Sequence, residues 1–142
     1  MDRGPIVWRL RLRNPPEVVY SYLSTEEGMR AFLAPQARRT GDRVELTFAS
    51  GERWEGRVIH ERPPHHFEME YLGGRVVFLL HGDGLGGTDL ELRQEEVHPD
   101  AWAENRAGWV SVLLLLKAQV DHAIDLRNGD PTRSWEAGYV DQ

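Results

Sequence analysis

The stretch "GWVSVLLLLKAQVD" (residues 108–121) places four consecutive leucines inside a segment with helical periodicity. Successive residues of an α-helix lie about 100° apart, so the four side chains cannot share one face. The segment predicts one long helix from Trp102 to Leu126 with a continuous apolar stripe: Trp109, Leu113, Leu116, Val120 and Ile124. Leu114 and Leu115 lie off this stripe, so we expect them to be exposed unless another surface covers them.

Upstream of this helix, most of the chain alternates apolar and polar residues, which is the period of a strand with one buried face. Residues 6–13 predict a first strand. Residues 14–35 predict two short helices, the first opened by Asn14 or Pro15 and the second capped by Ser24 or Thr25. Residues 43–99 predict about five strands in an antiparallel meander. The fold class is therefore α+β: a curved sheet of about six strands around a long C-terminal helix, with two short helices after the first strand.

The bulk properties of the chain limit its class. A chain of 142 residues fits a single domain over residues 1–142 and can bury a sizeable core. It has no cysteine, no apolar run near the roughly 20 residues of a membrane span, and no signal-peptide pattern, so we expect a cytoplasmic protein. The net charge of −6 with no basic stripe argues against a nucleic-acid partner.

Two motifs resemble cofactor or metal sites, but their contexts favour neither. "GDGLGG" (residues 82–87) matches a dinucleotide fingerprint, yet a strand follows it where a helix is needed, so we interpret it as a hairpin loop. His65 and His66 are neighbours at a strand entrance and would point to opposite faces, and no carboxylate lies at metal-site spacing. We therefore predict no cofactor and no metal.

The last predicted strand carries the strongest polar signal. Continuing its alternation turns Gln94 and Glu96 inward, where a carboxylate is costly without a partner. The alternation of its own strand places His60 on the same inner face as Trp54 and Val58. A few polar groups among large apolar walls are typical of a ligand pocket. The alternative is a β-bulge that reverses the alternation and exposes Glu96.

The stretch "PPEVVYSYLSTEEGMRAFLAP" (residues 15–35) resembles the opening of the START/Bet v-like (SRPBCC) superfamily, with Phe32 where that family usually has tryptophan. The final segment, from "GW" at residues 108–109 to the "DLRN" tail, resembles the bacterial branch related to the C-terminal domain of heat-shock protein 90 ATPase activators. The resemblance implies a helix-grip fold, in which a curved sheet wraps a long helix. The superfamily includes lipid carriers, cyclases and co-chaperones.

Three functions stay open. The first is binding of a hydrophobic small molecule, lipid or polyketide-like, between sheet and helix. The second is a co-chaperone-like interaction with a heat-shock protein 90 homologue, and the third is a cyclase or hydrolase using Glu96 and His60. The residues expected to line the pocket are Trp54, Val58, His60, Phe67, Met69, Tyr71, Phe78, Leu92, Gln94, Glu96, Trp109, Leu113 and Leu116.

The C-terminal tail, residues 127–142, is a candidate cover for Leu114 and Leu115. It carries Trp135, Tyr139 and Val140, which have no other evident apolar partner. Either this tail packs back on the domain over Leu114 and Leu115, or the outer face of the helix meets a second copy in a homodimer.

Overall fold

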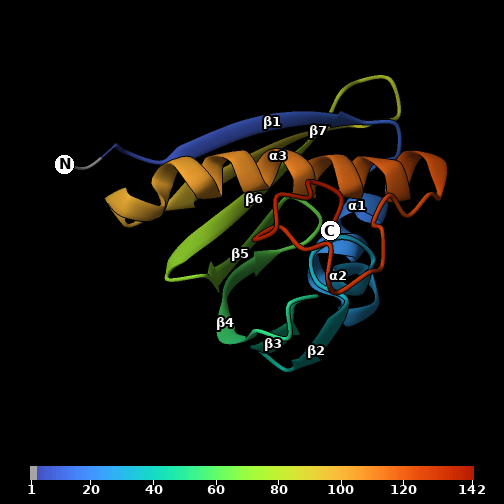
Figure 1. Cartoon of the computed structure of the whole chain (residues 1–142). Helices are drawn as coiled ribbons and strands as arrows, with labels where there is room; N and C mark the ends of the chain where they lie inside the picture. Colours follow the sequence, from blue (N-terminus) through green and yellow to red (C-terminus); the bar gives the residue numbers. More distant parts are fainter. Residues whose placement is uncertain (1–2) are drawn as a thin grey trace.

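A computed structural model describes residues 3–142 and contains one antiparallel sheet with three helices. The strand order is β1-β7-β6-β5-β4-β3-β2, so six strands form a meander and the first strand joins its far edge, beside β7. Figure 1 shows the sheet curving around the long helix α3. The strands are β1 (Ile6–Leu12), β2 (Gln36–Thr40), β3 (Arg43–Thr47), β4 (Arg53–Arg62), β5 (His66–Tyr71), β6 (Gly74–Gly82) and β7 (Thr88–Glu95).

Two short helices follow β1, as predicted: α1 (Pro16–Ser24) and α2 (Glu26–Phe32). A proline opens α1, where its missing N–H costs nothing. Thr25 caps α2, because its hydroxyl accepts a hydrogen bond of 3.0 Å from the backbone N–H of Gly28. The short helices therefore begin near the caps that the sequence indicates.

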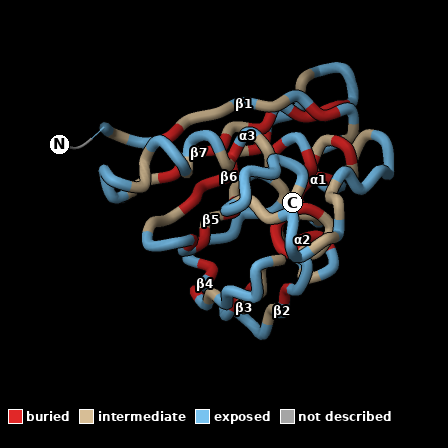
Figure 2. Tube along the Cα trace, viewed as in Figure 1, coloured by how far each residue is buried: buried red, intermediate tan, exposed pale blue. Residues whose placement is uncertain are grey.

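The long helix α3 (Pro99–His122) lies along the sheet and packs its apolar stripe into the core. Trp109, Leu113 and Leu116 are buried there, and Figure 2 shows buried positions gathering between the sheet and the helices. The helix starts three residues before the predicted bound, with His98 as its cap and Pro99 in its first turn, and it ends four residues early because Ala123 adopts a left-handed conformation. The predicted place of Ile124 on the stripe is wrong, since this residue lies beyond the helix and is exposed.

The fold class is as predicted, but the sheet has seven strands rather than about six. The additional strand is β2, which pairs with β3 and has the sequence "QARRT". Only Ala37 of this strand is buried, so it lacks the apolar alternation by which a strand is recognised.

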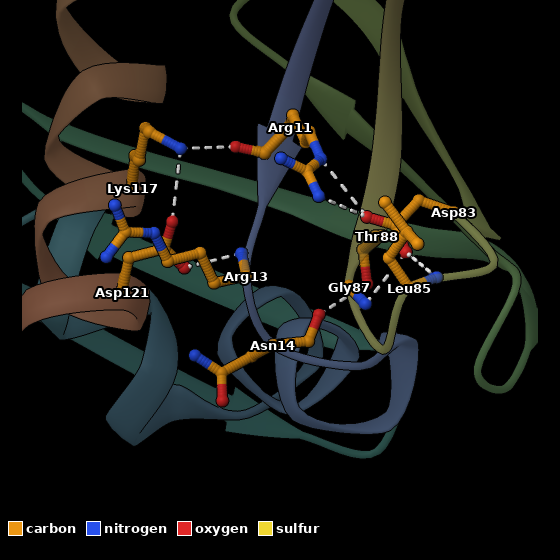
Figure 3. A network of polar contacts seen from close by, with 9 residues as sticks. All are labelled: Arg11, Arg13, Asn14, Asp83, Leu85, Gly87, Thr88, Lys117 and Asp121. Carbon is orange, nitrogen blue, oxygen red and sulfur yellow. Dashed lines mark hydrogen bonds and ion pairs between the residues drawn. The ribbon is translucent and has the colours of Figure 1, made fainter.

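A polar network fastens the end of β1 to α3 and to the β6–β7 loop (Figure 3). Lys117 donates to the backbone carbonyl of Arg11 and pairs with Asp121 at 3.1 Å. The Asp121 side chain is fully buried, and its carboxylate also accepts a hydrogen bond of 2.9 Å from the backbone N–H of Arg13. On the other side, the Arg11 guanidinium pairs with Asp83 at 3.0 Å, and Asp83 accepts the N–H groups of its own loop. The "GDGLGG" segment is thus a hairpin loop between antiparallel strands, as interpreted from its context.

Within residues 3–142, no helix is long and apolar enough to cross a membrane.

Candidate functional site

A cavity of about 210 Å³ lies on the flank of α3. Five parts of the chain form its walls: the end of α2 with the residues after it, the β3–β4 turn, the β5–β6 turn, α3, and the C-terminal tail. These segments are far apart in sequence, and only the tertiary fold brings them together. In Figure 1 the tail, in red, runs back from the end of α3 past α2 towards the middle of the molecule.

The inner wall of the cavity is apolar and rich in aromatic rings. The buried residues of this wall are Phe32, Leu33, Ala34, Tyr71, Trp109 and Leu115. The half-buried side chains of Phe48 and Trp135 continue the wall towards solvent. Tyr71 packs on Trp109 with 5.1 Å between ring centroids, so the aromatic surface is continuous. Such a wall favours an apolar ligand.

Tyr71 brings a polar group into this apolar wall. The residue is only 6% exposed, and its phenol oxygen has no hydrogen-bond partner among the described residues. Tyr71 lines the cavity, and every fully buried side-chain nitrogen and oxygen within residues 3–142 does have a partner, so the unpartnered phenol oxygen keeps some accessible surface. A tyrosine phenol is neutral at pH 7, and burial raises the pKa of this one further. It can therefore donate a hydrogen bond to a bound molecule.

Gly108 lies in the middle of α3 and lines the cavity. A Cβ atom built on this residue would have no heavy atom within 4 Å. Gly28 and Gly56 are among the glycines that differ, because a Cβ on Gly28 would meet the backbone of Tyr22 at 2.3 Å and one on Gly56 would meet the Trp54 ring at 2.2 Å. Packing therefore requires glycine at those two positions but not at Gly108.

The rim of the cavity carries carboxylates. Glu52 comes from the β3–β4 turn, Glu104 from α3 and Glu136 from the tail, and all three are exposed. None of them forms an ion pair with a residue that the structure describes. Arg127 is the one basic residue lining the cavity within residues 3–142, and both ends of its guanidinium pair with Asp125 at 2.9 Å. The rim therefore has an excess of negative charge.

The tail is held as a wall by a few hydrogen bonds. Trp135 donates its indole N–H to the Glu104 carboxylate at 3.0 Å, and the Ser111 hydroxyl donates to the backbone carbonyl of Val140. Arg127 donates to the backbone carbonyl of Arg30 in α2 at 2.7 Å. Leu115, which lines the cavity with parts of α2 and the tail, is 7% exposed, whereas Leu114 is 50% exposed. Figure 2 shows the tail itself as largely exposed.

Of the thirteen residues predicted to line a pocket, the structure brings Tyr71 and Trp109 to this cavity. Gln94 is fully buried as expected, but its amide is committed to the protein: it accepts from the Trp109 indole at 2.8 Å and donates to the Tyr71 carbonyl. The space between sheet and helix is filled by side chains of the hydrophobic core, so the free volume lies to one side of it. The predicted residues that contribute to this core without lining the cavity are Trp54, Val58, Phe67, Met69, Phe78, Leu92, Leu113 and Leu116.

The inward placement of His60 is wrong. The pairing of β4 with β5 shifts register between Val58 and His60, so one residue is left over and the alternation reverses. His60 then lies opposite Glu68 and is exposed. Its ring packs edge-on against His66, with 4.8 Å between centroids, on the outer face of the sheet.

The inward placement of Glu96 is also wrong. The strand β7 ends at Glu95, and Glu96 has a φ of 61°. The inward–outward alternation of β7 therefore does not continue to Glu96. The Glu96 side chain is 71% exposed and pairs with Arg75 at 3.6 Å. Glu96 and His60 therefore do not face one cavity, and the proposed enzyme mechanism that needed both residues there loses its basis.

The sequence contains a second helical pattern, which marks the cavity side of α3. Asn105, Gly108, Val112 and Leu115 recur at helical spacing and form a second stripe on α3, beside the core stripe. This stripe is less apolar and is interrupted by a glycine, so hydrophobic periodicity alone assigns it to the surface. No such periodic signal marks the residues that the turns and the tail contribute.

The histidines do not form a metal site with their neighbours. His65 contacts the Leu80 carbonyl at 2.9 Å, and His66 contacts the Glu68 carboxylate at 3.2 Å. Across residues 3–142, no three histidine or carboxylate side chains come close enough to hold a metal ion.

The sequence matches no protein-family model and no curated protein. Solved structures do match. The Aha1 dimer from Colwellia psychrerythraea aligns with a TM-score of 0.74 and 19% identity, over 83% of this chain and 96% of that one. Protein SSP2350 from Staphylococcus saprophyticus aligns with a TM-score of 0.73 and 13% identity, over 84% and 93%. CalU16 from Micromonospora echinospora aligns with a TM-score of 0.69 and 22% identity, over 84% and 77%.

At these identities the likeness establishes the fold and nothing finer. It confirms the predicted helix-grip architecture, a curved antiparallel sheet around a long C-terminal helix. One such scaffold serves many activities, so function has to be argued from the cavity.

Proposed function

We propose that the protein binds an apolar small molecule in the cavity beside α3. The cavity of 210 Å³ exceeds the volume of about 150 Å³ that is enough to take up benzene. It is smaller than the roughly 300–1,000 Å³ of drug-sized pockets, so the ligand has about one or two rings or a short chain. Tyr71 supplies a hydrogen bond to orient it.

Gly108 is the observation that carries this proposal. A glycine inside a helix costs about 0.5–1 kcal/mol relative to alanine. No neighbouring atom excludes a side chain at Gly108, so the structure offers no packing reason for this cost. Its position on the cavity wall supports a different reason: any side chain there would take up the space in which a ligand lies.

Filling the cavity from Gly108 tests the proposal. We expect the neutral, fluorescent two-ring probe 1-naphthylamine to bind the unmodified protein, with a blue shift of its emission. Gly108→Leu should abolish most of this binding, because the leucine side chain enters the cavity. Ala107→Leu is the matched control, since Ala107 immediately precedes Gly108 in α3, is exposed and does not line the cavity. Circular dichroism verifies that both variants are folded.

Two results would contradict the proposal. One is the absence of probe binding to the unmodified protein at probe concentrations up to the solubility limit. The other is equal probe affinity in the two leucine variants, which would place the probe elsewhere on the surface.

A second candidate function is an interaction with a chaperone or with a second copy of this chain. Val110 and Leu114 on the outer face of α3 are 41% and 50% exposed, which makes them available to a protein partner. The likeness to Aha1, solved as a dimer, also favours testing this function. Native mass spectrometry, alone and with the heat-shock protein 90 homologue of the same organism, measures both interactions. A monomer in every mixture, with no effect on chaperone ATPase activity, would remove this candidate.

A further inference from the structure

We infer that the ligand of this cavity carries a positive charge: an apolar or aromatic body with a protonated amine or a quaternary ammonium group. This inference rests on the proposed function and specifies the chemical class of the ligand. It follows from the charge of the rim together with the aromatic wall below it.

The negative charge of the rim is not cancelled by nearby basic residues. Arg53 is adjacent to Glu52, but it lies on the outer face of β4, because its neighbour Trp54 packs on the core side. Arg106 stacks on the Trp8 ring, 4.3 Å from its centroid, and Arg133 pairs with Asp130 within the tail. Neither lines the cavity. Arg127 does line the cavity, but its guanidinium is paired with Asp125. A cation entering the cavity would thus be the first unpaired positive charge near the three rim carboxylates.

The wall offers the other half of a cation site. Its aromatic residues come from all five parts of the chain that form the walls and are Phe32, Phe48, Tyr71, Trp109 and Trp135. The face of an aromatic ring attracts a cation, and such rings recognise quaternary ammonium groups. Trp135 combines both contributions, because its indole hydrogen-bonds Glu104 and so brings an aromatic ring next to a rim carboxylate. An anionic ligand would meet the carboxylates without any free basic partner.

A matched series of compounds tests the inference. The three probes share a naphthalene body and differ in their head group: 1-naphthylmethyl-trimethylammonium, 1-naphthylmethanol and 1-naphthylacetate. Isothermal titration calorimetry measures affinity, and amide chemical shifts of Gly108 and Leu115 report whether each probe occupies the cavity. An exposed charge pair changes a binding constant roughly 1.5- to 5-fold, so three carboxylates should favour the cation over the alcohol by about tenfold.

Removing the charges of the rim carboxylates, or adding salt, should weaken binding of the cationic probe alone. The triple variant Glu52→Gln, Glu104→Gln and Glu136→Gln keeps the shapes and the acceptor for the Trp135 indole. We expect it to lower the affinity for the cation about tenfold and to leave the alcohol unchanged. Glu17→Gln, on α1 and away from the cavity, is the control. Raising the salt concentration should weaken binding of the cation because the rim charges are exposed.

The outcomes separate this inference from the function on which it rests. If the alcohol or the acetate binds as tightly as the cation, and Gly108→Leu abolishes that binding, the cavity binds apolar molecules and the charge inference is overturned. If no probe shifts the amides around Gly108 in the unmodified protein, the proposed function falls together with the inference. Preference for the cation, lost in the triple variant and kept in Glu17→Gln, supports both.

Discussion

Replacing Gly108 with alanine should make the protein more stable. The substitution adds one methyl group to a helix, where alanine is favoured over glycine by about 0.8–1.0 kcal/mol. No heavy atom lies within 4 Å of the new Cβ, so there is no clash to subtract and no new core contact to add. We therefore expect the free energy of unfolding to rise by about 1 kcal/mol, which for a chain of 142 residues raises the melting temperature by about 3 °C.

Two other glycines of the same chain are controls. Gly28→Ala places a methyl group 2.3 Å from the Cα of Tyr22, and the backbone there cannot move without disturbing the junction of the two short helices. We expect this variant to lose about 1–3 kcal/mol, as overpacked sites do. Gly56→Ala meets the Trp54 ring at 2.2 Å and should also be destabilised, because the ring has to leave its place against Tyr71.

Urea denaturation at 25 °C and thermal denaturation measure all three variants in the same buffer. The expected order of stability is Gly108→Ala, unmodified protein, then Gly56→Ala and Gly28→Ala. A Gly108→Ala protein that is no more stable than the unmodified one would refute the reasoning, because its glycine would then have a structural role. Affinity for 1-naphthylamine in the same variant should fall, since the added methyl occupies the proposed ligand space.

Three further changes test other contacts. Thr25→Ala removes the cap of α2 and should cost about 1 kcal/mol in urea denaturation; an unchanged midpoint would show that this cap is not needed. Burial opposes ionisation of Asp121, but hydrogen bonds from the Arg13 N–H and Lys117 prevail and lower the pKa of this carboxyl. Its stabilisation is therefore present above the unfolded-state pKa of about 3.9 and is lost as pH falls through the folded pKa. Asp121→Asn should accordingly be less stable at pH 7 and show a shallower acid decline, and parallel pH profiles would contradict this. Deleting residues 131–142 should destabilise the monomer by uncovering Leu115; native mass spectrometry showing only loss of a dimer would oppose that account.

The order of the elements follows from local features of the sequence. The strand β1 alternates strictly, Thr25 supplies a cap, and α3 repeats its apolar residues every three or four positions. Each of these signals comes from neighbouring residues, so it survives without knowledge of the tertiary structure. The strand β2 has no such signal, because its only buried residue is Ala37 and it is a strand by virtue of pairing with β3.

The site was less predictable, because alternation assigns a face only while the strand remains regular. A register shift after Val58 turns His60 outward, and a left-handed residue after β7 turns Glu96 outward. Neither irregularity occurs at a glycine or proline, the residues that usually mark one. The alternation correctly predicts that Tyr71 and Gln94 are buried, because both lie within regular parts of their strands.

The four leucines show why the free volume lies beside the core rather than within it. Leu113 and Leu116 fill the space under the sheet together with Trp109, whose indole is fixed by Gln94, so no room is left there. Leu115 points about 160° away from Leu113 around the helix, where the facing surface is α2 and an irregular tail rather than a strand. Irregular chain held by a few hydrogen bonds packs less completely than a sheet, and Gly108 adds no side chain to fill the gap. The helix therefore completes a closed core on one face and leaves an open cavity on the next, and the tail that walls this cavity also brings one of its rim carboxylates.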